Sequence, residues 1–307
     1  MTYHIGWNRD LDYALEKLPE MEACPSELYK HLLTQSQSDD VKTALVARDN
    51  EPIALLGLRR SRNRRSWEPV TNWIIPGGCI AARQGHELQA LEALGNRTKI
   101  GWWRMPRRPP SGSGRDISVS PTYGMKCTAD FDAYWKKTRL HLQQARKRCA
   151  NFRFELDPPG ATEWVVRNWD RHWRGDHGDK LGLELRLAVS DYLQPLARHA
   201  TLAMYDGSDL VGGALQIAHG KTSVATVMYS RPEYKHARVG KRLMSLYFKH
   251  ARDAGFDAID IGGGHGYKSQ WAPIMGERAE VTLWPTMQRP LRWASKALKK
   301  VRNMRPR

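Results

Sequence analysis

The sequence contains few cysteines and no long apolar stretch. Its four cysteines lie far apart and form no CxxC pair, so we expect neither a zinc site nor a disulfide framework. No segment approaches the ~18 consecutive apolar residues that a membrane-spanning helix needs. The first residues combine neither a basic start nor an apolar block, so no secretory signal is visible. We therefore expect a cytoplasmic protein with reduced thiols and no bound metal.

The composition is that of a folded protein with room for two domains. The 307 residues are 41% hydrophobic and include 12 tryptophans, which excludes a disordered chain. Residues 43–58 (TALVARDNEPIALLGL) and 201–217 (TLAMYDGSDLVGGALQI) each read as an apolar strand, a polar turn and a second apolar strand. Both segments are hairpin signals. This similarity between the two segments suggests a duplicated lobe, with chance similarity between two hairpins as the alternative.

Positive charge is in large excess and lies in clusters. The formal net charge is +17 and the pI is near 9.9. This balance favours an anionic partner, which could be nucleic acid, a lipid surface or a phosphorylated substrate. The basic segments are residues 59–65, 136–148 and 289–307. Each one alone is compatible with a solvated surface, whereas three together favour an anionic ligand or surface.

A break at Pro158-Pro159-Gly160 separates two expected lobes. The first lobe spans residues 1–157 and ends with a basic helix at 130–151. The second lobe spans residues 158–288, and residues 289–307 are expected to form a basic amphipathic tail helix. The other expected elements are helical material at 11–33, a strand ending at 76–78, a helix at 87–94, a strand at 99–105, helices at 162–174 and 191–199, a strand at 223–229, a helix from residue 240, and strands at 256–261 and 280–283.

The segment 239–273 carries most of the functional signal. A helix begins at Gly240, and the apolar strand 256–261 that follows it ends in three glycines. Directly after these glycines come three side chains able to exchange protons or carry charge, His265, Tyr267 and Lys268. A helix N-terminus is suited to binding phosphate, and titratable side chains at a strand end can carry out chemistry. The combination indicates an enzyme that uses a phosphate-bearing cofactor.

Three motifs in the chain resemble one known family. They are the basic helix KKTRLHLQQARKR, the strand-to-helix segment MYSRPEYKHARVGKRLM and the strand end DIGGGHGYKSQW. Their order resembles that of GCN5-related acetyltransferases (GNAT). More narrowly, it resembles the twin-lobed branch with Fem-type aminoacyltransferases and CelD-type polysaccharide-biosynthesis acetyltransferases, and Mig-14-type proteins are also similar. The resemblance implies an α/β fold of duplicated GNAT-like lobes, each a mixed, largely antiparallel sheet flanked by helices.

The resemblance also implies a site for acetyl-CoA or another acyl-CoA. The pyrophosphate would bind at the helix start formed by Val239, Gly240, Lys241 and Arg242. The family pattern there is Arg/Gln-x-x-Gly-x-Gly/Ala, and Lys235, Arg238 and Gly240 occupy its positions, so only the last glycine is kept. Arg238 could block close approach of the ligand or supply charge to a phosphate. A distortion in the preceding strand would place two backbone groups at the reaction centre, those of Met228 and Tyr229.

The glycine-rich strand end supplies the candidate catalytic residues. His265 could take a proton from an attacking amine or hydroxyl, and Tyr267 could return one to the leaving thiolate. Lys268 could stabilise a developing oxyanion or bind a phosphate. Related sequences carry an acidic residue in this loop, so Asp260 is a second candidate base, provided that it leaves the sheet pairing. The alternative is a glycine-rich turn with exposed polar side chains.

The resemblance implies transfer of an acyl group to an amine or hydroxyl of a cell-envelope sugar or lipid-linked acceptor. A Fem-type transferase that uses aminoacyl-tRNA is the first alternative. The second is a non-catalytic protein that binds a membrane or a polyanion, attached at the inner face of the membrane. In these alternatives the three basic segments contact tRNA or anionic lipid. The tryptophans at 164, 169 and 173 could form a stacking platform, with ordinary core packing as the competing interpretation.

Overall fold

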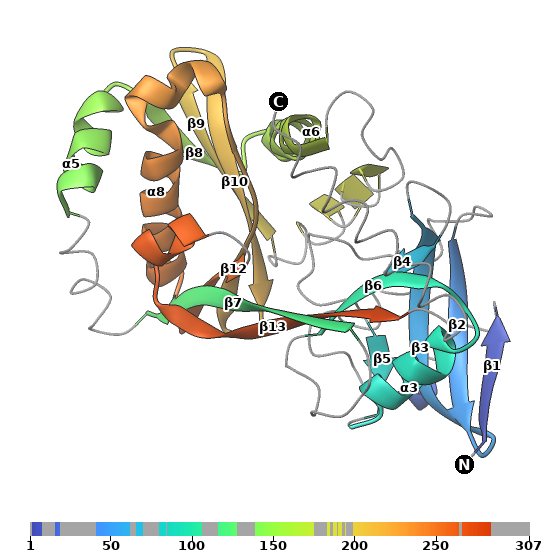
Figure 1. Ribbon diagram of the computed structural model, residues 1–307. Coiled ribbons are helices and arrows are strands. Elements are labelled where there is room, and N and C mark those ends of the chain that lie inside the picture. Colours follow the sequence, from blue (N-terminus) through green and yellow to red (C-terminus); the bar gives the residue numbers. More distant parts are fainter. Residues whose placement is uncertain are drawn as a thin grey trace, which may run out of the picture.

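Strands from both halves of the chain join in one mixed sheet in the computed structural model (Figure 1). The described residues are 2–7, 16–18, 41–61, 66–69, 80–83, 85–105, 116–127, 139–174, 183–184, 187–188, 190–191, 194, 199–263 and 266–283. In this part of the chain the sheet has 13 strands in the order β1-β2-β3-β4-β6-β13-β7-β12-β11-β10-β9-β8, and β5 pairs with β3 outside this path. Two neighbouring pairs, β4 with β6 and β11 with β12, are parallel and the others are antiparallel. The sheet is therefore mixed and largely antiparallel, as predicted.

The element bounds are as follows. The strands are β1 (Tyr3–Trp7), β2 (Val41–Arg48), β3 (Glu51–Arg60), β4 (Trp67–Pro69), β5 (Ile80–Ala82), β6 (Ile100–Met105), β7 (Asp116–Lys126), β8 (Arg153–Leu156), β9 (His199–Asp206), β10 (Asp209–His219), β11 (Thr222–Ser230), β12 (Ala258–Gly263) and β13 (Ile274–Leu283). The helices are α3 (Glu87–Gly95), α5 (Arg139–Arg148), α6 (Ala161–Arg174) and α8 (Val239–Asp253), with short 3-10 helices η2 (Pro232–Ala237) and η3 (Gly266–Gln270).

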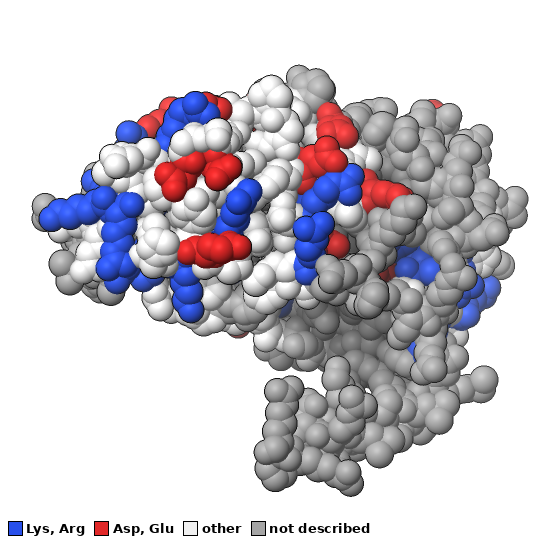
Figure 2. Space-filling view, turned by 90° about the horizontal axis from the view of Figure 1, so that it is seen from above, with Lys and Arg blue, Asp and Glu red and all other residues white. Residues whose placement is uncertain are grey.

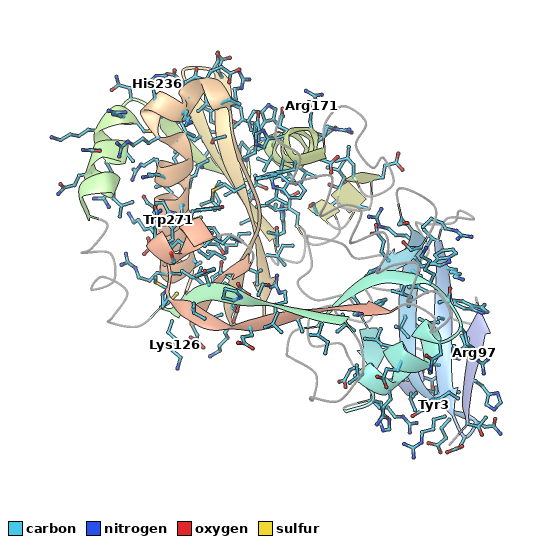
Figure 3. All side chains as sticks on the ribbon, in the orientation of Figure 1. Tyr3, Arg97, Lys126, Arg171, His236 and Trp271 are labelled. Carbon is cyan, nitrogen blue, oxygen red and sulfur yellow. The ribbon has the colours of Figure 1, made fainter. Side chains whose placement is uncertain are left out.

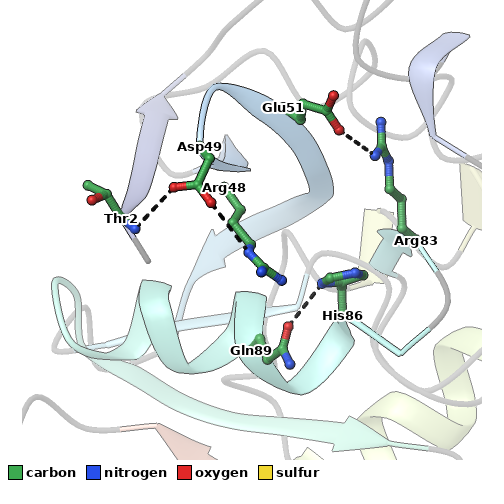
Figure 4. A network of polar contacts seen from close by, with 7 residues as sticks. All are labelled: Thr2, Arg48, Asp49, Glu51, Arg83, His86 and Gln89. Atoms are coloured by element: carbon green, nitrogen blue, oxygen red, sulfur yellow. Dashed lines mark hydrogen bonds and ion pairs between the residues drawn. The ribbon is translucent and has the colours of Figure 1, made fainter.

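Both predicted hairpins are confirmed. In the β2–β3 hairpin, Asp49 and Asn50 have φ angles of 49° and 69°, the conformation that a two-residue turn between twisted strands requires. Asp49 also accepts a hydrogen bond of 3.4 Å from the backbone N–H of Thr2, which ties the start of the chain to this turn (Figure 4). In the β9–β10 hairpin, Gly207 supplies the positive φ. Local turn chemistry thus fixes both hairpins.

Two long strands connect the halves of the molecule. β7 lies between β13 and β12, and β13 lies between β6 and β7. In Figure 1 these two strands run across the molecule from the side of α8 to the side of α3. The division into lobes at residues 157 and 158 stays a prediction, and strand pairing crosses it in both directions.

Several predicted elements need correction or lie outside the described residues. His199, the expected end of a helix at 191–199, is the first residue of β9. The last strand is longer than the predicted 280–283, and β1, β7 and β8 were not predicted. The basic helix is described from Arg139 onward, whereas residues 130–138, most of 11–33 and all of 289–307 lie outside the described part of the chain.

Helices α6 and α8 cover opposite faces of β10. Successive residues of a strand face opposite sides of a sheet. A Cβ atom added at Gly212 would lie 2.7 Å from Cγ1 of Val239 on α8, and one added at Gly213 would lie 2.4 Å from Cγ2 of Val165 on α6. Glycine at both positions lets each helix approach the sheet closely. Val239, at the start of α8, is thereby held directly above the sheet.

One part of the basic segment 59–65 is not a surface feature. Arg59 is only 1% exposed and forms an ion pair with Glu68. This corrects the expectation that the whole segment contacts an anionic partner. Residues 62–65 lie outside the described residues. Within the described part of the chain, no helix is both long and apolar enough to span a membrane.

Candidate functional site

The predicted phosphate-binding helix begins at Val239, directly after a residue in the left-handed conformation. Arg238 has φ 61° and ψ 36°. Its carbonyl accepts hydrogen bonds of 3.0 Å from the backbone N–H groups of both Lys241 and Arg242. Arg238 therefore stands in a conformation that favours glycine, which matches the glycine position of the family pattern.

The space beside Gly240 is open in the described structure. The one atom within 4 Å of a Cβ added at Gly240 would be the Ser230 hydroxyl oxygen, at 3.5 Å. Lys235 lies in η2 and is exposed, and Lys241 and Arg242 follow in the first turn of α8. No residue in this first turn is acidic. The helix start thus combines accessible backbone with positive charge, and these features fit a phosphate group.

Strand β11 contains a bulge next to the residues predicted at the reaction centre. Leu215 of β10 pairs with Val227 and the next residue, Gln216, pairs with Ala225, so Thr226 is the extra residue on β11. The Thr226 hydroxyl donates a hydrogen bond of 3.4 Å to the carbonyl of Leu215. A bulge interrupts the regular ladder and redirects the strand. The sequence did not indicate this position.

Met228 and Tyr229 follow the bulge and regain regular pairing. Met228 pairs with Ala214 and packs against core clusters on the α8 side of the sheet. Tyr229 pairs with Gly213, and its ring meets that of Trp164 on α6 at a centroid distance of 5.4 Å. The two side chains therefore point to opposite faces of the sheet. The feature that Met228 and Tyr229 share is their backbone, which runs along β11.

β11 and β12 pair over a short stretch and then separate. The parallel pairing covers residues 222–224 of β11 and 258–260 of β12. β11 continues to Ser230, and β12 continues along β7 to Gly263. A Cβ atom added at Gly263 would lie 2.8 Å from the carbonyl oxygen of Pro121 on β7, so glycine is required there. β11 ends beside the start of α8, where the Ser230 hydroxyl oxygen would lie 3.5 Å from a Cβ atom added at Gly240.

Asp260 keeps its place in the sheet. It pairs with Val224 on one side and with Gly124 on the other. Its carboxylate accepts a hydrogen bond of 2.5 Å from the N–H of Gly262 and lies 3.8 Å from the Arg278 guanidinium. Asp260 was a candidate base only if it left the sheet pairing, and it remains paired.

Of the predicted site residues after β12, Lys268 is anchored by hydrogen bonds and Tyr267 is exposed. The Lys268 ammonium donates hydrogen bonds of 2.6 Å and 3.1 Å to the carbonyls of Ile261 and Gly263. The side chain of Tyr267 is 54% exposed, yet neighbouring protein atoms partly desolvate its hydroxyl group and raise the pKa of the phenol. His265 lies outside the described residues.

An aromatic cluster lies where α6 meets the end of β11. The His172 ring lies 6.0 Å from that of Tyr229 and 5.2 Å from that of Trp173, which is 60% exposed. The Arg231 guanidinium lies 5.8 Å from the centre of the Trp164 ring. Sequence reasoning named the tryptophans but missed His172 and Arg231, because only the fold brings α6 and β11 together.

Comparison with known proteins finds a matching domain family and similar folds. Residues 136–269 match the family described as Acetyltransferase (GNAT) domain. No curated protein matches the chain in sequence. The chain is similar in structure to L-PGS from Bacillus licheniformis, with a TM-score of 0.56 and 13% identity over 94% of this chain and 96% of that one.

Two further solved structures are similar. One is the C-terminal domain (DUF2156) of a protein described as a lysylphosphatidylglycerol synthetase from Agrobacterium fabrum, with a TM-score of 0.54 and 10% identity over 94% of this chain and 97% of that one. The other is a conserved protein of unknown function from Bacteroides thetaiotaomicron, with a TM-score of 0.51 and 11% identity over 91% and 100% of the two chains. At such identities the likeness concerns the fold. The predicted GNAT-like fold is confirmed.

Proposed function

We propose that the protein is an acyltransferase that takes its acyl group from acetyl-CoA or another acyl-CoA. The match of residues 136–269 to the Acetyltransferase (GNAT) domain supports an acyltransferase. The observation that supports the donor most directly is the start of α8, where open space at Gly240 and a first turn without acidic residues lie beside Ser230, the last residue of the bulged strand β11. The backbone N–H groups of Val239 and Gly240, with Lys241 and Arg242, would hold the pyrophosphate.

The reaction would take place beside the bulged strand. The backbone of Met228 and Tyr229 would polarise the thioester carbonyl. The acceptor amine or hydroxyl attacks this carbonyl, the C–S bond breaks, and the acceptor proton passes to His265, which remains the proposed base. Tyr267 protonates the departing thiolate, and its raised pKa keeps the phenol protonated at neutral pH.

Lys268 and Asp260 would position the turn that carries Tyr267. Because the Lys268 ammonium bonds two carbonyls at the end of β12, we assign it to holding the turn that carries Tyr267. The Asp260 carboxylate holds the N–H of Gly262 in the same turn. Lys235 and Arg238 precede the helix and would add positive charge beside the pyrophosphate.

The acceptor would lie on the α6 face of β11. Tyr229 projects toward this face, and its contacts with Trp164 and His172 form an aromatic surface next to the proposed thioester position. Aromatic rings suit the apolar face of a sugar ring. An envelope sugar or a lipid-linked precursor is therefore the proposed acceptor, and contact with an anionic membrane surface is proposed with it.

A second candidate keeps the fold and changes the donor to aminoacyl-tRNA. The similarity to L-PGS and to a protein described as a lysylphosphatidylglycerol synthetase favours it, as does the basic helix α5. Binding of tRNA with a steep dependence of log K on log salt, together with no affinity for acetyl-CoA, would select this candidate.

Calorimetric titration with acetyl-CoA tests the first candidate. The Gly240→Trp variant places a large ring in the open space at the helix start, and its affinity should fall at least about tenfold. Lys249→Trp places the same ring on an exposed position later in α8 and should bind like the wild type. Absence of binding to the wild-type protein at near-millimolar acetyl-CoA would refute the proposed donor.

A further inference from the structure

Strand β8 lies at one end of the sheet, and β9 is its single neighbouring strand in the described part of the chain (Figure 1). The backbone N–H of Asp157, directly after β8, donates a hydrogen bond of 2.8 Å to the carbonyl of Thr201 on β9. Inward and outward backbone groups alternate along an antiparallel strand. The N–H and C=O groups of Phe154 and Leu156 therefore point away from β9. No described residue forms a hydrogen bond with these outward groups, so they can pair with a further strand.

The opposite end of the sheet is less open. β1 forms this end, and the N–H of Asp49 donates a hydrogen bond of 3.2 Å to the carbonyl of Thr2 beside it. By the same alternation, the carbonyl of Tyr3 points outward. It accepts a hydrogen bond of 3.1 Å from the Arg97 guanidinium, and Figure 3 labels both residues at its lower right. One outward group of β1 is thus occupied by the chain itself, which leaves β8 as the more accessible edge.

The two faces of β8 differ in character, and both reach solvent. Phe154 and Leu156 pair with core residues of β9 and extend the apolar face that α8 covers, yet they remain 37% and 47% exposed. Arg153 and Glu155 lie on the other face, where Nε of the arginine is 2.8 Å from Oε1 of the glutamate. Their side chains are 59% and 36% exposed. The edge strand therefore presents two apolar side chains on one face and one charge of each sign on the other.

We propose that β8 pairs antiparallel with β8 of a second copy of this chain, around a twofold axis at Phe154. The outward N–H and C=O groups of Phe154 would bond those of the partner's Phe154, and the two rings would meet on the apolar face. Arg153 would lie opposite the partner's Glu155, and Glu155 opposite the partner's Arg153. These are non-hydrogen-bonded positions, at which side chains of neighbouring strands come closest. The sheets of the two copies would join into one.

The order of charges along β8 is the observation that favours a second copy as the partner. Charged side chains on an edge strand commonly keep other chains away. In β8, opposite charges stand at equal distances on either side of Phe154, so a twofold axis there brings each charge against its opposite. A shift of one residue would bring Phe154 against the partner's Glu155 and mix the two faces. The charges thus select one register. This inference does not depend on the proposed acyl donor.

The net charge of the protein opposes this association at long range. It is +17, and Lys and Arg side chains gather at the left edge of Figure 2, on the side of α5, the helix that precedes β8. At about 0.15 M salt, interactions beyond roughly 8 Å are largely screened. Side chains directly opposite each other on neighbouring strands lie within that distance. The association should therefore be measured at this salt concentration.

Sedimentation of the full chain tests the proposal. The mean mass of the wild type should rise from 35.1 kDa toward twice that value between about 1 µM and about 500 µM protein. Arg153→Glu places acidic side chains opposite each other at two places and should weaken the dimer at least about tenfold. Glu155→Arg should do the same with basic side chains. The double variant Arg153→Glu/Glu155→Arg restores opposite charges and should dimerise within about threefold of the wild type.

Arg83→Glu is the matched control. It makes the same change of net charge at another exposed ion pair, that of Arg83 with Glu51, which Figure 4 shows, and it should dimerise like the wild type. Circular dichroism and thermal melting check that each variant is folded. A wild type that stays at the monomer mass over the whole range would refute the pairing. So would single variants that dimerise normally, or a double variant that does not recover. None of these outcomes affects the proposed acyl donor.

Discussion

Arg238 adopts a left-handed backbone conformation that costs a non-glycine residue about 1–2 kcal/mol. The same position carries glycine in the family pattern. The greater freedom of glycine in the unfolded chain offsets about 0.5–1 kcal/mol of this cost. Arg238→Gly should therefore raise the free energy of unfolding by roughly 0.5–1 kcal/mol, measured by urea denaturation. Arg238→Ala keeps the backbone strain and should show no such gain; equal gains in both variants would contradict this explanation.

His199 is a buried histidine that is held neutral. Its side chain is 5% exposed, and burial lowers its pKa to about 4, although Asp157 acts in the opposite direction. Nε2 lies 3.3 Å from the hydroxyl of Thr201, and Nδ1 has no hydrogen-bond partner among the described residues. Protonation of this ring is therefore more costly in the folded protein than in the unfolded chain.

The low pKa of His199 predicts a dependence of stability on pH. Between about pH 4 and 6.5 the unfolded chain binds a proton at this residue and the folded protein does not, so stability increases with pH across this window. The increase due to His199 is at most about 3 kcal/mol. Urea denaturation at pH 4.5 and pH 7 should show a smaller difference for His199→Gln than for the wild type. An unchanged difference would show that His199 is not the cause.

At the scale of elements, the position of α6 depends on Gly213. A side chain at this position meets Val165 of α6, and Tyr229, paired with Gly213, contacts Trp164 of the same helix. Gly213→Ala should push α6 away from the sheet and lower the free energy of unfolding by about 1–3 kcal/mol. Tryptophan fluorescence should change with it. Gly266→Ala, where an added Cβ meets nothing within 4 Å, is the control, and equal effects would contradict the packing argument.

The sequence predicted those elements whose signals are local. The hairpin turns at Asp49-Asn50 and Gly207 need particular backbone angles, and their residue types reveal them. β7 was missed because Pro121 interrupts its alternation of polar and apolar residues, and it becomes a strand through pairing with β12 and β13, far along the chain. The resemblance implied a distortion in strand 223–229, but its position at Thr226 could not be predicted, since it depends on the register with β10.

The candidate site was predictable to a similar extent. The glycine at 240 and the charged residues after it identified the start of α8. Arg238, which stands where the family pattern has glycine, is the left-handed residue directly before that helix. The anchoring role of Lys268 and the position of His172 beside Tyr229 depend on tertiary contacts. Neither could be predicted from residue type and spacing.

At the scale of the whole molecule, the two halves share their sheet. β13 follows nearly all other elements in the chain, yet it lies between β6 and β7 in the sheet. Pairing across such sequence separations must await synthesis of the C-terminal part, and contacts of this kind slow folding. The shared strands place β12, which contains Asp260, on the same sheet as the strands that carry the core of the other half. The proposed donor site is thereby attached to a continuous framework.

Hydrogen–deuterium exchange with and without acetyl-CoA tests the central claim most directly. Bound acyl-CoA should slow the exchange of backbone amides at residues 226–230 and 238–242, where the bulged strand and the start of α8 lie. The β2–β3 hairpin should exchange at the same rate in both samples. Unchanged exchange at the start of α8 with saturating ligand, or protection confined to other segments, would contradict the account.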